Sequence, residues 1–458
     1  MASSKFTRKK TLLALALPLV LGGCATLSKD GGLDSVQRTT QERIGKDVQW
    51  ARTAQEQEKL ADRVNDLLKQ QPLSADNAVQ VALLNNKGLQ SRFNDLGISE
   101  ADLLQASELP NPSFSMLYAS HNGEYKIEQS LTFNIFSLVT MPMAREVEQR
   151  RFEQTKRLAT IDVLRLAADT RKAYYNAIAA EQSVAYSEQV QRAAEASAEL
   201  AKKMVEAGNF SARDHAREQA FYAEAAAQQA RARQQAVATR EQLVRLMGLW
   251  GEQTSFKLPE RLPDLPAAPT DQPDIEAKAM QQRIDLQALK QDIDALAKNL
   301  GLAKTTRFIN VLEFGPARVL EGKRSDPYKK GVTISFELPI FDFGTAKVAK
   351  AEAIYMQSFN RAAEAAVNAR SEVRESYYNY RSSYDLAKHY RDEIVPLRKR
   401  ISDENMMRYN GMLISAFELL SDAQSQIASV NSYIEALRDF WVAQANLDMA
   451  MTGKLSAN

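Results

Sequence analysis

The chain has 458 residues, of which 45% are hydrophobic and 25% are charged, with 18 Gly, 3 His and one Cys. These fractions are typical of a folded protein, and the length allows two or three ordinary domains. One cysteine excludes a disulfide framework and a thiolate-rich metal site, and three scattered histidines leave little material for another metal centre. The nucleotide-binding patterns GxGxxG and GxxxxGK[ST] do not occur in the sequence. The composition therefore points away from common enzymes and toward a helix-rich structural or transport protein.

The N-terminus has the pattern of a bacterial secretory signal. Four basic residues precede a short apolar run over 11–23, which is too short to span a bilayer as a helix. The run ends in Leu21-Gly22-Gly23-Cys24, which resembles a lipobox. We therefore expect a signal peptide over 1–23 and lipidation of Cys24, and Ala25 favours sorting to the outer membrane. An ordinary signal peptide with a chance cysteine is the alternative.

Removal of this signal changes the charge balance of the chain. It takes away four positive charges, leaving 55 Lys and Arg against 57 Asp and Glu. The mature chain then has no overall basic charge, so no nucleic-acid partner is expected. No later apolar run is long enough for a transmembrane helix, so a membrane crossing would need strands closed into a barrel.

Beyond a polar, helix-compatible segment over 24–71, the sequence predicts two β-hairpins. Ile127–Ile135 alternates apolar and polar residues and has a partner strand near Ser113–Tyr118. Gly331–Leu338 alternates likewise and has a partner near Arg307–Phe314. This is the pattern of a water-filled barrel wall, although a half-buried soluble sheet has the same pattern. Four strands cannot close a barrel, but three chains supply twelve.

Each predicted hairpin is followed by two long helices. Ala144–Ala207 contains no Gly or Pro, and a helix of that length extends roughly 96 Å. Thr345–Asn410 is similar, with Pro396 as a site for a kink. After a glycine turn, Ser211–Met247 and Met412–Met451 form the returning helices.

The two halves of the chain repeat each other. Tyr174-Tyr175-Asn176 recurs as Tyr377-Tyr378-Asn379, and Gly208 recurs as Gly411 at the same offset. Each glycine ends a long helix, where a left-handed residue is expected. We expect both turns to contact a partner protein; the alternative is a turn with no such role.

The repeat sets the domain boundaries. They are a first repeat over 72–257, a proline-rich connector over 258–273, and a second repeat over 274–458. The lipidated segment 24–71 precedes them. The connector is expected to be extended and not packed.

This order of elements resembles the TolC-like outer-membrane efflux factors. The resemblance is carried by Pro72–Asn86, Leu109–Pro112, Leu338–Gly344, Tyr409–Met412 and Glu418–Gln424. It implies a mainly α fold with a small β part, with long helical hairpins and two β-hairpins per chain. It also implies a homotrimer that forms an α-barrel and a 12-stranded β-barrel, a periplasmic adaptor and an inner-membrane pump as partners, and a passive conduit without catalysis or cofactor.

Charged residues follow the two glycine turns. Glu418 and Asp422 are four residues apart, on one helix face, and a three-fold axis would make them rings of negative charge. Arg213 and Arg217 occupy the matching stretch of the first repeat, and we expect them to pair with these acids at a closed tip. The run that ends in Asp422 is one residue longer than the family's, a shift of about 100° on a helix. A plain solvated helix face is the alternative.

The sequence does not decide which substrate is transported, and it leaves two alternatives to a channel protein. Met406, Met407 and Met412 could meet Cu(I), but such methionines more often fill helix packing, so no metal site is assigned. The resemblance of the Tyr409–Ile414 stretch to the heavy-metal branch of this family favours heavy-metal efflux over multidrug efflux or type I secretion. A periplasmic adaptor and a coiled-coil structural lipoprotein are the alternatives to a channel.

Overall fold

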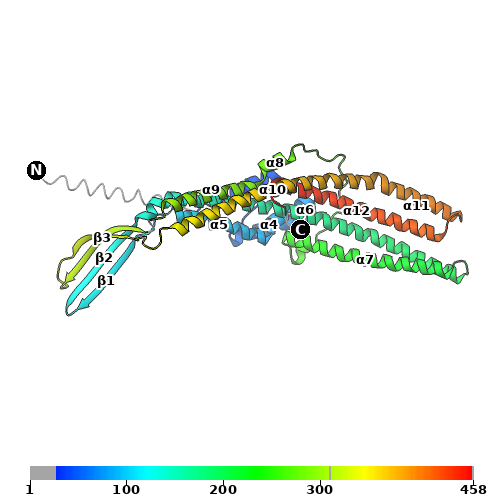
Figure 1. Ribbon diagram of the computed structural model, residues 1–458. Coiled ribbons are helices and arrows are strands. Elements are labelled where there is room, and N and C mark those ends of the chain that lie inside the picture. The colour runs from blue at the N-terminus through cyan, green and yellow to red at the C-terminus, as the bar shows by residue number, and fades with distance from the viewer. Residues whose placement is uncertain (1–26, 309–310, 456–458) are drawn as a thin grey trace. The chain divides into compact units, whose positions relative to one another are not determined.

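The computed structural model describes residues 27–308 and 311–455 and is mostly helical, with one four-stranded sheet (Figure 1). The predicted signal peptide and Cys24 lie outside the described residues. Among the described residues, none of the helices combines the length and the hydropathy that a membrane span requires. The chain folds as two compact units, each assembled from three separate stretches of sequence.

The first unit is made of Met1–Asp34, Asn94–Leu158 and Gln287–Glu364, and it contains the sheet. The sheet is antiparallel in the order β1-β2-β3-β4. Its strands are β1 (Ser113–His121), β2 (Glu124–Asn134), β3 (Leu312–Gly322) and β4 (Lys329–Phe336). The two hairpins expected from the alternating sequence are therefore confirmed, and they join into one sheet through β2 and β3.

The third strand lies further along the chain than the sequence predicted. The expected strand over Arg307–Phe314 overlaps only the start of β3, because Gly315 and Pro316 read as strand breakers. The fold uses both residues inside the strand. A Cβ on Gly315 would lie 1.8 Å from the Leu131 carbonyl oxygen of β2, so only glycine fits there.

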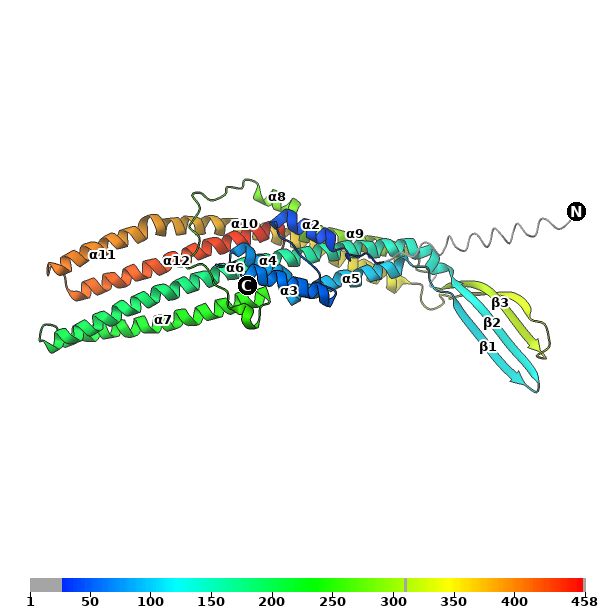
Figure 2. The ribbon, with the colours of Figure 1, turned by 180° about the vertical axis from the view of Figure 1, so that it is seen from behind.

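The second unit is made of Ser35–Phe93, Ala159–Leu286 and Ala365–Asn458, and it contains two long helical hairpins (Figures 1 and 2). The first hairpin pairs α6 (Ile135–Glu206) with α7 (Ala212–Met247). Ion pairs join the two helices, from Arg240 to Glu181 and from Arg233 to Glu188, each at 2.8 Å. Helix α6 begins before the predicted start, with Pro142 inside it.

The second hairpin pairs α10 (Thr345–His389) and α11 (Val395–Asn410) with α12 (Ala416–Thr452). A π-helical turn over Tyr390–Ile394 separates α10 from α11. It lies directly before Pro396, which has no amide hydrogen to donate to the preceding turn. The irregularity expected at Pro396 is therefore present as a local change of helical period.

The remaining helices of the described residues are shorter. They are α2 (Leu33–Ile44), α3 (Ala54–Leu68), α4 (Ala75–Asn85), α5 (Lys87–Ser107), a 3-10 turn over Gly251–Thr254, α8 (Ile275–Gln282) and α9 (Ile284–Thr305). Helix α3 begins with a complete capping box, in which Thr53 and Glu56 satisfy each other's backbone amides. Its buried face, Leu60, Val64 and Leu68, joins the main core of the second unit.

The proline-rich connector is irregular, as expected, but it is packed. Leu258, Leu262 and Leu265 are buried in the main core. The Trp441 indole donates to the Pro263 carbonyl at 3.1 Å, and the Tyr384 hydroxyl donates to the Ala267 carbonyl at 2.8 Å. The expectation of an unpacked connector is wrong because the leucines between its prolines cover the aromatic surface of the two hairpins.

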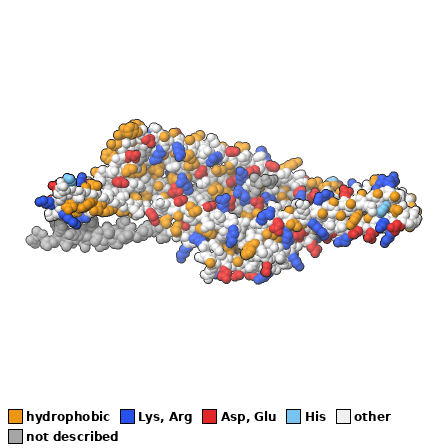
Figure 3. Space-filling model, turned by 90° about the horizontal axis from the view of Figure 1, so that it is seen from below, with side chains coloured by type: hydrophobic (Ala, Val, Ile, Leu, Met, Phe, Trp, Pro, Cys, Tyr) orange, Lys and Arg blue, Asp and Glu red, His pale blue; other side chains and the backbone are white. Residues whose placement is uncertain are grey.

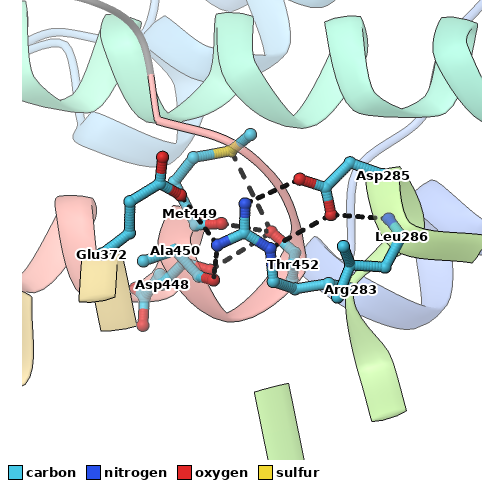
Figure 4. A network of polar contacts seen from close by, with 8 residues as sticks. All are labelled: Arg283, Asp285, Leu286, Glu372, Asp448, Met449, Ala450 and Thr452. Atoms are coloured by element: carbon cyan, nitrogen blue, oxygen red, sulfur yellow. Dashed lines mark hydrogen bonds and ion pairs between the residues drawn. The ribbon is translucent and has the colours of Figure 1, made fainter. Parts of the chain in front are cut away.

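A buried arginine ties three helices of the second unit together (Figure 4). Arg283 is 1% exposed and lies just before α9. It donates to both oxygens of Asp285 at 3.0 and 2.6 Å, to Glu372 of α10 at 2.8 Å, and to the Ala450 carbonyl of α12 at 3.2 Å. Burial disfavours its charge, but the hydrogen bonds and charges of the two carboxylates raise the pKa of Arg283 above its usual value. This network ties the start of α9 to both helices of the second hairpin, α10 and α12.

Candidate functional site at the hairpin tips

The first hairpin turn is closed by Gly208. This residue has a left-handed φ of +75°, and the Asn209 amide beyond it donates to the Met204 carbonyl at 2.8 Å. These are the features of a Schellman motif, in which the left-handed position favours glycine. The predicted conformation of Gly208 is confirmed. Helix α7 then begins at Ala212, and its N-cap residue Ser211 accepts a hydrogen bond on its hydroxyl from the Asp214 amide at 3.0 Å.

The second hairpin turn is built differently from the prediction. Gly411 has φ −81°, which any residue can adopt, and the left-handed residue is Met412 at φ +59°. The Leu413 amide closes the turn by donating to the Arg408 carbonyl at 2.9 Å. The expectation that Gly411 supplies the left-handed residue is wrong because α11 continues for one residue more than α6 before it turns.

The helix caps give the true correspondence between the two tips. Ser211 and Ser415 each accept a hydrogen bond from the amide three residues later, at Asp214 and Glu418. The caps are 204 residues apart, one more than the offset of the two glycines. At this offset Glu418 corresponds to Asp214, and Asp422 corresponds to Glu218. Sequence reasoning missed both acids of the first repeat, although the Ser-x-x-Asp/Glu pattern could have revealed them.

The four charged residues predicted at the tip do not pair with one another within the chain. Arg213 and Arg217 both lie near Asp214, at 3.7 and 3.2 Å. The Arg217 guanidinium also stacks over the Phe417 ring at 4.5 Å and so links the two hairpins. Glu418 instead accepts from the Ser415 amide at 3.1 Å and completes a capping box.

Asp214 is held as a carboxylate by its surroundings. The Ser211 hydroxyl donates to it at 2.6 Å, and this hydrogen bond, with the positive charges of Arg213 and Arg217, lowers the pKa of Asp214 below its ordinary value. A negative charge in the first turn of α7 also complements the helix dipole. The first tip therefore carries a cluster of one carboxylate, Asp214, and two guanidinium groups, Arg213 and Arg217.

The equivalent acids Glu218 and Asp422 are each only 8% exposed in the chain. Glu218 accepts from the Ser197 hydroxyl of α6 at 2.8 Å. One oxygen of Asp422 and the Nε2 atom of His215 are buried without a hydrogen-bond partner. Burying a polar atom without a hydrogen bond costs free energy. The tip is therefore a region where two buried polar atoms lack hydrogen-bond partners within the chain.

An apolar groove of about 510 Å³ lies between the two hairpins near the tips. All four helices contribute to it, including Leu200 and Met204 of α6, Phe221 of α7, Met406 of α11 and Leu420 of α12. Beyond the groove the second turn is strongly apolar, and Met412 is 94% exposed. Chemically this arrangement offers a surface for another helix, with charged groups at its edge.

The sheet has one apolar and one polar face. Register places Phe114 beside Leu131 and Phe314 beside Ile334, and all four side chains are exposed in the single chain. On the opposite face the Ser115 and Ser130 hydroxyls hydrogen-bond at 2.7 Å, and Thr132 donates to Glu313 at 3.5 Å. An apolar face that is open in the chain needs lipid or protein to cover it.

Several solved structures of channel proteins have a fold similar to that of this chain. CusC, whose title describes transmembrane channel formation, is 17% identical with a TM-score of 0.70, over 83% of this chain and 92% of its own. The Campylobacter jejuni channel CmeC is 15% identical with a TM-score of 0.66, over 88% and 89%. The open state of the Neisseria gonorrhoeae channel MtrE is 17% identical with a TM-score of 0.66, over 82% and 88%. The chain has a TolC-like outer-membrane channel fold.

This channel fold confirms the resemblance read from the order of the sequence motifs. The likeness is structural, since no family model and no curated protein matches the chain by sequence. No cluster of three or more His, Cys, Asp or Glu that could hold a metal ion occurs in the described ranges. The tip methionines Met407 and Met412 are exposed and do not fill helix packing.

Proposed function

We propose that the chain is the outer-membrane channel subunit of a tripartite efflux system, acting as a passive conduit without catalysis. The observation that carries this proposal is the combination, in one channel-like chain, of an open amphipathic sheet and two long helical hairpins. Three copies bring twelve strands together, so that the apolar faces meet lipid and the polar faces line the pore. The helices of the same three copies form the α-barrel.

The N-terminal segment anchors this subunit. Residues 1–23 act as the signal peptide, and Cys24 carries the lipid that attaches segment 24–71 to the outer membrane. The repeats 72–257 and 274–458 each supply one β-hairpin and one helical hairpin, and 258–273 connects them. In this proposal the sheet lies in the outer membrane and the helical hairpins lie in the periplasm.

The hairpin turns at Gly208 and Gly411 meet a periplasmic adaptor, and an inner-membrane pump supplies the energy. The apolar residues around Met412 and the groove between the hairpins support this role, since they leave a helix-sized surface without a cover. An adaptor identity for the chain itself is disfavoured, because the four-stranded sheet with one open apolar face is a membrane-facing feature.

The pore constriction lies in the same region. Glu418 is exposed, whereas Asp422 is buried beside its own hairpin, so Glu418 is the better placed of the two to form a ring of charge. Arg213 and Arg217 contribute through Asp214 and Phe417, and not through a direct pair with the acids.

Conductance of the purified full-length protein in planar bilayers tests the channel. We expect a trimer by mass and stepwise, cation-preferring conductance. Glu418→Gln should reduce that preference, whereas the exposed Glu224→Gln on α7 should leave it unchanged. A trimer without conductance would favour the coiled-coil structural lipoprotein and overturn the proposal.

A deletion strain identifies the cargo. The resemblance of Tyr409–Ile414 favours heavy metals, with drugs or secreted proteins as the alternatives. Growth against copper, silver, zinc, cobalt, cadmium and a panel of drugs, with complementation, separates them. Sensitivity to metals alone would support heavy metals as the cargo. Sensitivity to drugs alone would make drugs the cargo and would leave the channel proposal standing.

A further inference from the structure

The basic residues on the two faces of the sheet differ in whether an acidic residue lies beside them. On the polar face, Lys329 lies 3.5 Å from the carboxylate of Glu321, and Lys126 is the register partner of the same glutamate. On the apolar face, Arg318 of β3 lies directly opposite Lys330 of β4. Alternation places no Asp or Glu of the four described strands on that apolar face.

The cross-strand row that holds these two cations has no negative charge to balance them. It continues from Lys330 and Arg318 to Gln129 of β2 and Met116 of β1. Arg318 donates to the Gln129 side-chain oxygen at 2.6 Å, and its guanidinium lies 5.0 Å from the Tyr328 ring. Both contacts orient the guanidinium, and neither neutralises it. Like charges directly opposite on a sheet repel, so this row is poised for an anion.

The row lies at a boundary along the strands. Toward the helices, the same face presents Phe114 with Leu131, and Val332 on β4. Toward the hairpin turns it presents Tyr118 and Tyr125, whose rings are 6.3 Å apart. Figure 3 shows Lys and Arg side chains beside hydrophobic ones on the part of the surface that the sheet forms, without distinguishing its two faces. Aromatic and basic residues at the edge of an apolar band are typical of the headgroup level of a membrane.

Resting on the proposed outer-membrane location, we propose that Arg318 and Lys330 bind the phosphate of an outer-leaflet glycolipid. The acyl chains of that lipid cover the apolar rows at Phe114, Leu131 and Val332. A guanidinium binds phosphate through two parallel hydrogen bonds, and the ammonium beside it adds a point charge. The phosphate removes the repulsion across the row, and the Gln129 contact holds the guanidinium in place for it.

Lipid retention by the purified full-length protein tests the site. The wild type, the double variant Arg318→Gln/Lys330→Gln and the control Lys329→Gln are incubated in detergent with bis-phosphorylated lipid A. Parallel samples receive the same lipid without its phosphates, or equimolar inorganic phosphate as a competitor. Native mass spectrometry then counts the retained lipid. The control removes a cation one residue away that faces the polar side and already has Glu321 as its partner.

We expect the wild type and Lys329→Gln to retain phosphorylated lipid about tenfold better than the double variant. Equal retention by all three proteins, or equal retention of the dephosphorylated lipid, would overturn the proposal. Displacement by equimolar inorganic phosphate would make the row a free-anion site and would also overturn it. Conductance of the same samples tests the channel separately. If the wild type conducts but retains no lipid, the lipid site is wrong and the proposed channel function stands.

Discussion

Met412 has, at the second hairpin turn, the left-handed backbone conformation that Gly208 has at the first. In both turns the next residue donates its amide to a carbonyl five residues back, from Asn209 to Met204 and from Leu413 to Arg408. The two tips are thus closed by the same type of hydrogen bond, but the left-handed position is occupied by glycine in the first turn and by methionine in the second. Gly411, which the repeat places opposite Gly208, has an ordinary helical φ.

This difference predicts opposite outcomes for the two glycines. Gly208→Ala forces a side chain into a left-handed conformation and should destabilise the first turn by about 1 kcal/mol. Gly411→Ala adds a Cβ whose nearest neighbours lie 3.5 Å away, so it should change stability by less than about 0.5 kcal/mol. Hydrogen exchange of the tip amides measures both. Equal acceleration in the two variants would contradict the assignment of the turns.

A second pair of glycines tests the sheet. Gly315→Ala places a Cβ 1.8 Å from the Leu131 carbonyl oxygen, whereas Gly331→Ala on β4 meets no atom within 4 Å. The first change must push β3 away from β2 and should prevent the proposed trimer from forming, which would remove its band from gels of unheated samples. Gly331→Ala should run on gels as the wild type does. If Gly315→Ala behaves as the wild type, the β2–β3 register is wrong.

The buried arginine should be the most sensitive charged residue of the second unit. Arg283→Met leaves Asp285 and Glu372 partly buried without their shared cation, which should cost about 3–5 kcal/mol in the free energy of unfolding. The control is Arg374→Met on the same helix as Glu372, where an exposed pair with Glu276 at 3.6 Å is worth about 0–1 kcal/mol. Urea unfolding compares the two variants. Similar losses would show that the network does not hold the helices together.

Acid should loosen the first tip through Asp214. Its hydrogen bond from Ser211 and the nearby arginines lower its pKa in the folded chain. The unfolded chain therefore takes up a proton first, and the stabilisation is complete above the ordinary pKa of about 3.9 and is lost as pH falls through the lower folded value. Asp214→Asn should reduce the rise in protease cleavage at this turn as the pH falls below about 4. Glu224→Gln should keep the wild-type dependence, and a pH profile unchanged by Asp214→Asn would contradict the assignment.

The sequence predicted the features that depend on local pattern. Alternation located β2 and β4, the Gly-free and Pro-free runs located the long helices, and the turn at Gly208 has the expected conformation. The errors arose where a packing contact overrides a local signal. Gly315 reads as a breaker but permits close approach of two strands, and the leucines of 258–273 pack despite the prolines around them.

The tip assignments show the same division. The glycine offset aligned Gly411 with Gly208, and it concealed the match of Asp214 with Glu418 and of Glu218 with Asp422. Only the capping hydrogen bonds at Ser211 and Ser415 reveal that match. The contact between Arg217 and Phe417 joins residues that are 200 positions apart, so no local pattern could predict it.

That contact links the two hairpins at the tip, and it predicts a coupled effect on opening. Arg217→Gln and Phe417→Ala each remove a cation–π contact worth about 0.5–1 kcal/mol, so each should raise the open probability of the channel in bilayers by about two- to fivefold. The double variant should open no more than either single variant, because all three lack the same interaction. Arg231→Gln is the control, since Arg231 is exposed on the same helix as Arg217 and donates to Gln228 of that helix at 3.3 Å. Additive effects of the two single variants, or an equal effect of Arg231→Gln, would show that the stacked pair does not govern opening.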